Sequence, residues 1–204
     1  MKFQVSAKDK KTLCKQAPEF REVVRRIEFD GFECNGDLFH ALVQSIISQQ
    51  LSIKAADTIY NRVEQLLGTI TAENLKSAAV EDLRACGLSA RKIEYLREIA
   101  DAVLSGRIDF DALARLPDEE IMKELVKLKG VGEWTAEMLL IFALGRPDVL
   151  SFKDLGIRRG IMLLNKLEEL TEEDFEVYRK RYSPYGTLAS LYLWRIKDGG
   201  LSVK

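Results

Sequence analysis

Apolar side chains recur at helical spacing along most of this chain, and the alternation that is typical of β-strands is scarce. This periodicity predicts an all-α protein of about ten helices joined by short turns. With 204 residues, 47% of them hydrophobic and 31% charged, the chain can bury a full core and fits one domain or two small lobes.

Start and stop signals place the individual helices, with Ser52 and Ser89 as caps and a loop expected from Phe29 to Gly36. The predicted helices run, in chain order, from Asp37 to Gln49, Ile53 to Leu67, Leu75 to Cys86, Ala90 to Ser105, about Asp118 to Lys127, Glu133 to a stop at Gly145-Arg146-Pro147, from Asp154 onward, Thr171 to about Tyr182, and Tyr185 to Ile196 with an end at Asp198-Gly199-Gly200.

The most informative turn is Gly130-Val131-Gly132, which separates two of these helices. Two glycines allow a tight turn. The backbone N–H groups from Val131 to Trp134 then lie at a helix N-terminus, where the dipole favours an anion such as phosphate. Taken alone, a Gly-x-Gly turn is more often an ordinary helical hairpin.

Asp154 begins another predicted helix, with Lys153 and Arg158 beside it. Nearby cations and a helix N-terminus favour an ionised carboxylate at neutral pH. From position alone, however, such an Asp is more often a plain N-cap. Gly156 and Gly160 follow four residues apart and predict a smooth helix face that permits close approach.

Gln49-Gln50-Leu51-Ser52 links two strong helices with a polar loop that ends in one apolar side chain. A protein that extrudes a base from a duplex must fill the vacated stack, and apolar wedges are the usual filler. This loop is therefore a candidate probe into DNA. The alternative, in which Leu51 packs back onto the core and the glutamines act as caps, has equal weight without further information.

Jointly these motifs resemble the helix-hairpin-helix DNA glycosylases, and within them the 3-methyladenine DNA glycosylase II family. The pattern Leu-x-Gly-Val-Gly-x-x-Thr-Ala is followed about twenty residues later by Asp154. The resemblance covers the chain from about Leu38 to Gly199, and its other motifs are Ser48 to Ser52 with Lys54-Ala55-Ala56, Cys86 to Ile93, and Leu191-Tyr192-Leu193-Trp194.

The resemblance implies two helical lobes around a cleft that holds the base. Residues 1–51 and 146–204 would form a terminal lobe with the catalytic Asp154, and residues 52–145 a central lobe with the helix-hairpin-helix. The implied function is a monofunctional DNA glycosylase that flips and excises alkylated purines, of the 3-methyladenine and 7-methylguanine type, in base excision repair. The expected partner is double-stranded DNA with a damaged base, bound by a monomer that needs no cofactor and no metal.

The implied site residues fall into two groups. Those that line the base pocket are Trp134, Trp194, Met138 and Leu155. Those that bind DNA are Gln50, Leu51, Ser52, Gly130, Val131, Gly132, Glu133 and Arg158. Hydrophobic core is the alternative role for both tryptophans.

By the same resemblance, Trp134 stands where bifunctional members of the superfamily carry a Schiff-base lysine. Without an amine there, water oriented by Asp154 should attack in place of an enzyme nucleophile. Lys153 is the one nearby amine that offers an alternative.

Three further features limit the function. The net charge of −1 argues weakly against a nucleic-acid partner. The stretch from Arg179 to Lys197, however, contains no acid and five cations: Arg179, Lys180, Arg181, Arg195 and Lys197. Solvated helix faces are the alternative interpretation of these cations. Cys14, Cys34 and Cys86 form no Cys-x-x-Cys pair, and so suggest no disulfide framework or zinc site. No apolar run approaches the roughly 20 residues of a membrane span, so no membrane partner is expected and the cytoplasm, with nucleoid association in a prokaryote, is the expected location.

Two other functions remain open from the residues. One is a glycosylase for deaminated or mismatched bases, and the other is a non-catalytic DNA-binding module that uses the same hairpin. His40, the only histidine, lies on a helix rich in core residues and is expected to be structural.

Overall fold

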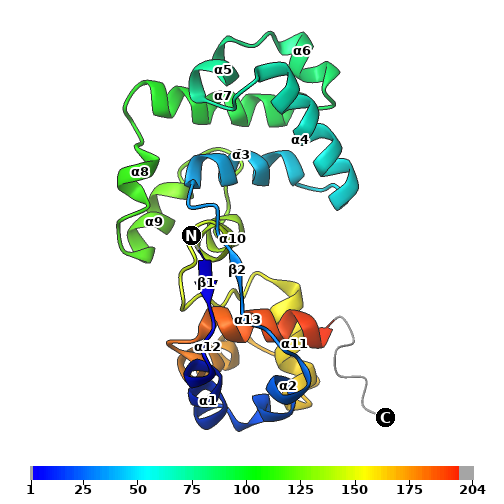
Figure 1. The fold of residues 1–204 in the computed structure, drawn as a ribbon, viewed down its shortest axis with the longest axis vertical. Coiled ribbons are helices and arrows are strands. Elements are labelled where there is room, and N and C mark those ends of the chain that lie inside the picture. Colours follow the sequence, from blue (N-terminus) through cyan, green and yellow to red (C-terminus); the bar gives the residue numbers. More distant parts are fainter. Residues whose placement is uncertain (1, 198–204) are drawn as a thin grey trace. The chain divides into compact units, whose positions relative to one another are not determined.

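The chain divides into two units, and each is built almost wholly from helices (Figure 1). The computed structural model describes residues 2–197. The first unit combines the described residues of Met1–Cys34 and Leu140–Lys204, and the second is Asn35–Leu139. Residues 35–51 and 140–145 thus lie in the opposite units from those expected. The predicted helix end at Asp198-Gly199-Gly200 lies outside the described residues.

The first unit consists of a small sheet and helices from both ends of the sequence. Its elements are β1 (Lys2–Gln4), α1 (Ala7–Gln16), the 3-10 helix η1 (Pro18–Phe20), α2 (Arg21–Arg26), β2 (Gly31–Glu33), α11 (Leu155–Asn165), α12 (Glu172–Tyr182) and α13 (Gly186–Arg195).

Helices α11 and α13 pack closely at the centre of this unit, and α12 contacts both α13 and α1. Gly160 makes the close approach possible, because a Cβ atom there would lie 2.6 Å from the carbonyl oxygen of Leu193. The core around this contact is aromatic: Phe20 and Tyr182 are fully buried, with ring centroids 5.0 Å apart. Burial of such large side chains dominates the stability of a core.

The prediction of a loop from Phe29 to Gly36 is wrong in part, because β2 pairs with β1 as a two-stranded antiparallel sheet. Phe3 lies opposite Phe32, and their stacked rings are 5.1 Å apart. Gly31 adopts φ +121°, and a Cβ atom there would collide with the carbonyl oxygen of Phe3. Strands of three residues are too short for alternation to reveal them.

The second unit is one continuous segment with α3 at its centre, packed against α4, α7 and α8. The core includes Leu42, Ile46, Leu96 and Ile99, all with no exposed surface. Its elements are α3 (Leu38–Ser48), α4 (Ile53–Leu67), α5 (Ala72–Ser77), α6 (Val80–Ala85), α7 (Ala90–Leu104), α8 (Phe110–Leu113), α9 (Asp118–Leu125) and the first part of α10 (Glu133–Phe142).

The single helix predicted from Leu75 to Cys86 is wrong, since α5 and α6 are separated by extended backbone at Ala78 and Ala79. The guanidinium of Arg97, on α7, donates a hydrogen bond to the carbonyl oxygen of Ala78 at 2.6 Å. Alanine favours helix. A tertiary contact from a distant helix therefore overrides the local preference here.

The predicted capping residues are confirmed. The hydroxyl of Ser52 accepts a hydrogen bond from the Ala55 N–H, and Ser89 caps α7 in the same way. Thr171 forms a capping box with Asp174 at the start of α12. None of the helices within residues 2–197 is both long and apolar enough to cross a membrane.

Candidate active site

Asp154 is the N-cap of α11, and its Oδ1 atom accepts two hydrogen bonds. One comes from the backbone N–H of Ile157 at 2.8 Å and the other from the indole Nε1–H of Trp194 at 2.9 Å. The residue is only 8% exposed. The side chain is thus more than a plain cap, because a residue forty positions along the chain also fixes its orientation.

Gly156 makes room for the indole of Trp194 beside the carboxylate. A Cβ atom at this position would lie 2.8 Å from Cδ1 of Trp194 and 3.1 Å from Oδ1 of Asp154. With Gly160 against Leu193, both glycines of the predicted smooth face lie at close contacts, which confirms that prediction.

Two buried hydroxyl groups of α13 anchor the loop that precedes Asp154. Thr187 Oγ1 donates to the carbonyl of Arg146 at 2.6 Å and accepts from the Val149 N–H at 3.1 Å. Ser190 Oγ donates to the carbonyl of Val149 at 2.9 Å. One helix therefore holds both the loop and the indole that contacts the carboxylate.

Phe142 is a further aromatic residue of this region that the sequence analysis missed. Its ring stacks on Trp194, with centroids 5.7 Å apart and planes 21° apart, and also contacts Phe32 at 5.4 Å. The side chain is 45% exposed. A signal was present in the sequence, because Trp134, Met138 and Phe142 recur every four residues, a spacing that places side chains on one side of a helix.

The remaining predicted base-pocket residues differ in exposure. Trp134 is 44% exposed and Leu155 is 51% exposed, so neither is a core residue. Met138 and Trp194 are half-buried.

Arg158, predicted to bind DNA, lies with its guanidinium over the ring of Phe152, 5.1 Å from the centroid. Its Nε atom is buried and finds no hydrogen-bond partner within the described chain. Stacking on an aromatic face holds the charge beside the first turn of α11.

The predicted hairpin is present in the second unit, between α9 and α10. Gly130 adopts φ +82°, and a Cβ atom there would collide with the ring of Tyr95. Both the backbone conformation and the lack of space therefore require glycine at this position. At Gly132 a Cβ atom would meet nothing within 4 Å. The N–H of Val131 donates to the carbonyl of Leu128 at 3.2 Å, so its expected availability to a phosphate is wrong.

The loop from Gln49 to Ser52, hereafter the probe loop, projects between α3 and α4. Gln50 is exposed and adopts φ +59°, a left-handed conformation that is costly for a residue with a Cβ atom. Leu51 is 38% exposed, and this does not fit the alternative in which it packs into the core. Beside the loop, Ser52, Lys54 and Arg62 line a hollow of about 400 Å³.

Lys92 does not point its charge outward as a phosphate contact would require. Its Nζ atom donates to the carbonyls of Ile47 at 2.7 Å and Gln49 at 2.8 Å. The side chain of Gln49 in turn donates from Nε2 to the carbonyl of Gly130 at 2.9 Å.

The basic stretch from Arg179 to Lys197 is partly neutralised. Arg179 bonds to Glu176 at 2.9 Å, and Arg181 lies 3.3 Å from Glu19. Both arginine side chains remain partly exposed.

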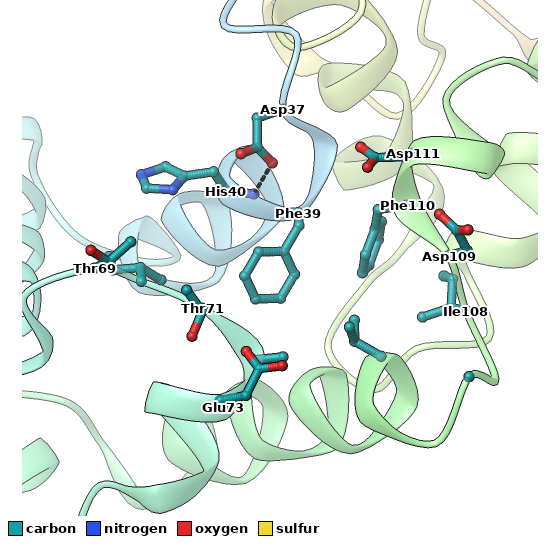
Figure 2. A pocket seen from close by; sticks show the side chains of 14 residues that line it. Asp37, Phe39, His40, Thr69, Thr71, Glu73, Ile108, Asp109, Phe110 and Asp111 are labelled. Carbon is teal, nitrogen blue, oxygen red and sulfur yellow. Dashed lines mark hydrogen bonds between the residues drawn. The ribbon is translucent and has the colours of Figure 1, made fainter.

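A separate cavity of about 590 Å³ lies in the second unit, where α3, α5 and α8 begin (Figure 2). Asp37, Thr71 and Asp109 line it and cap those three helices. Helix capping accounts for two of its carboxylates, and its acidic rim is unsuited to a phosphate backbone. His40 also lies here and contacts the Tyr60 hydroxyl through Nε2, in keeping with a structural role.

Residues 2–197 contain no cluster of histidine, cysteine or carboxylate side chains that could hold a metal ion. The three cysteines, all in this part of the chain, form no disulfide. Burial raises the pKa of the thiols of Cys14 and Cys86.

The Gly130-Val131-Gly132 hairpin, the probe loop and Asp154 all lie within one segment that a protein-family model matches. A family model described as HhH-GPD superfamily base excision DNA repair protein matches residues 43–184, and the chain belongs to this superfamily.

Within the superfamily, the chain belongs to the DNA-3-methyladenine glycosylase family. It is 40% identical over 162 residues to DNA-3-methyladenine glycosylase 1 of Schizosaccharomyces pombe, an alignment that covers 77% of this chain and 71% of that protein. The solved structure of a Bacillus halodurans DNA-3-methyladenine glycosidase superposes with a TM-score of 0.83 at 39% identity, over 97% of this chain and 92% of the other. A Schizosaccharomyces pombe 3-methyladenine DNA glycosylase in complex with abasic DNA gives 0.79 at 34% identity, over 94% and 97%.

Proposed function

We propose that this protein is a monofunctional DNA glycosylase that extrudes purines alkylated on a ring nitrogen and hydrolyses their N-glycosidic bond. The observation that carries the proposal is the buried carboxylate of Asp154, held on one oxygen by the Ile157 N–H and the Trp194 indole N–H. Two N–H donors on one oxygen fix the direction of the carboxylate.

Departure of the base leaves positive charge on the deoxyribose. A fixed carboxylate in a site with little water stabilises that charge more than water does, because it needs no reorganisation during the reaction. Asp154 thus lowers the barrier electrostatically and orients the water that attacks the sugar carbon.

Aromatic rings beside the carboxylate suit a base that is itself a cation. Alkylation of a ring nitrogen places positive charge on a purine, and a cation is attracted to the face of an aromatic ring. Trp194 and Phe142, stacked and half-exposed, offer such faces within the first unit. Trp134, Met138 and Leu155 are further proposed contacts of the base.

Two elements of the second unit and one residue of the first are the proposed contacts with DNA. The N-terminus of α10 at Gly132 and Glu133 would receive a phosphate, where contacts set the position of the protein without reading sequence. Gln50 and Leu51 would enter the duplex, Leu51 as the wedge and Gln50 as the plug in the vacated stack. Arg158 is a proposed phosphate contact beside Asp154.

The absence of an amine at Trp134 supports a hydrolytic mechanism. A Schiff base requires a primary amine that attacks the sugar, and this position supplies an indole. The product would be free base and an intact abasic strand, the starting point of base excision repair.

The test is release of free base from two duplexes, one methylated and one containing uracil, measured side by side with the same protein. Release of methylated purines alone supports the proposal. Release of uracil alone would assign the site to deaminated bases, and binding without release from either duplex would leave a DNA-binding module.

A further inference from the structure

We infer that Lys92 and Gln49 are positioning residues that lock the probe loop onto the hairpin turn, so that Leu51 and Gln50 are held ready for insertion before DNA arrives. This inference rests on the proposed function, because it assigns a role in base extrusion.

Lys92 holds the C-terminal end of α3. The last carbonyl groups of a helix lack partners within the helix. Lys92, in the first turn of α7, donates from Nζ to two of these oxygens, those of Ile47 and Gln49. A cation at a helix C-terminus also complements the helix dipole. Burial lowers the pKa of the Lys92 ammonium, in keeping with its internal position.

Gln49 links this end of α3 to the hairpin. Gln49 donates from Nε2 to the carbonyl of Gly130, the residue whose left-handed backbone forms the turn before α10. One glutamine therefore joins the end of α3 to the hairpin turn, although 81 residues separate the two in the sequence.

The probe loop is itself held at both ends. Gln50 is held at φ +59°, and such a conformation persists only when its surroundings enforce it. On one side Lys92 and Gln49 supply that constraint. On the other, the Leu51 N–H donates to the carbonyl of Ser48 at 3.1 Å, and the hydroxyl of Ser52 caps α4. Both ends of the loop are fixed, while the side chain of Leu51 stays partly exposed.

A preformed probe has a kinetic consequence. A flexible loop would lose conformational freedom on insertion, and that loss would raise the barrier to extrusion. A loop already held in its inserted shape avoids most of this cost. Weakening the anchor should therefore slow extrusion more than it weakens binding to undamaged DNA.

The experiment uses Lys92→Met and Gln49→Met, which put an unbranched apolar side chain of similar length at each position and remove the donors. The matched controls are Lys76→Met, which loses only a surface pair with Asp101, and Gln44→Met on the exposed side of α3. Base release is measured on a duplex with the methylated base normally paired and on one with the same lesion opposite an abasic site, where less pairing must be broken. A 2-aminopurine next to the lesion reports unstacking by its fluorescence.

For Lys92→Met and Gln49→Met, single-turnover release from the paired duplex should fall by about tenfold and the 2-aminopurine signal should fall with it. Release from the duplex with the abasic partner should stay within about twofold of wild type. The controls should change neither.

An equal loss on both duplexes, or no loss in a variant that is folded by circular dichroism, would overturn the inference. If Lys92→Met does not fold, Gln49→Met decides the matter by the same criteria. Failure of the wild-type protein to release base from either duplex would instead remove the proposed function.

Discussion

At the scale of single residues, Asp154 accepts one hydrogen bond from its own helix and one from Trp194, and a substitution here can separate a catalytic role from a capping role. Asn is as good an N-cap as Asp. Asp154→Asn should therefore fold and bind lesion DNA, yet lose base release by about a hundredfold or more, because the charge that stabilises the transition state is gone.

The matched control for this variant is Asp109→Asn, which replaces the N-cap of α8 that accepts from the Ala112 N–H at 2.9 Å. It should leave turnover unchanged. Near-normal base release by Asp154→Asn, measured as the single-turnover rate constant on methylated duplex, would remove Asp154 from the mechanism.

Gly156 gives a second test at this scale. A methyl group there would push against Cδ1 of Trp194, so Gly156→Ala should move the indole away from Asp154. Base release should fall by roughly ten- to a hundredfold, because small displacements in a site are costly. Trp194→Phe keeps an aromatic ring and removes the N–H donor. Its base release should be reduced by a similar factor.

Comparison of these two variants by melting temperature and turnover separates packing from chemistry. If both melt as wild type does and both retain full turnover, the bond between Trp194 and Asp154 has no part in catalysis.

Resemblance to a family predicted Asp154 and Trp194 as separate site residues, but nothing in the sequence indicated that they touch. Their contact depends on α11 and α13 crossing closely at Gly156 and Gly160. Spacing along one helix reveals which residues share a face, and it carries no information about which distant helix meets that face.

At the scale of elements, the hairpin offers a comparison of two glycines. Gly130→Ala should lower the melting temperature, since alanine at φ +82° is strained and would collide with Tyr95. Gly132→Ala should leave the melting temperature unchanged, because its Cβ atom meets nothing within 4 Å.

Both variants should nevertheless weaken binding, and by the same factor for lesion and undamaged duplexes, because phosphate contacts do not read the base. Fluorescence anisotropy on the two duplexes measures this. A Gly132→Ala protein that changed lesion preference while binding plain DNA normally would argue against a phosphate at the hairpin.

Helices with clear caps were predicted from sequence, as at Ser52, Ser89 and Thr171. The break between α5 and α6 was not, because two alanines carry no stop signal and the bond from Arg97 that holds Ala78 spans 19 residues. The strands β1 and β2 were missed for a related reason: their pairing joins segments that local patterns treat separately.

At the scale of the whole molecule, the mechanism determines the product. With an indole at position 134, borohydride should trap no covalent adduct between enzyme and DNA, because a carboxylate and water cannot form the imine that trapping reduces. The strand should remain intact after base loss and break only when heated in alkali, as denaturing gel electrophoresis would record.

The control for this prediction is Lys153→Ala, which removes the amine next to Asp154 in the sequence. It should release base from the methylated duplex and, like wild type, give no adduct. A trapped adduct in wild type that disappears in this variant would establish a lysine nucleophile and contradict the monofunctional mechanism.

The division of the chain into two units also affects the order in which they can fold during synthesis. The second unit is one uninterrupted segment, whereas the first requires residues from both ends of the sequence. As the ribosome extends the chain, Asn35–Leu139 can close its core while α1 still lacks its contact with α12. A nascent chain would therefore hold a finished hairpin and probe loop before α13 can supply the indole that bonds to Asp154.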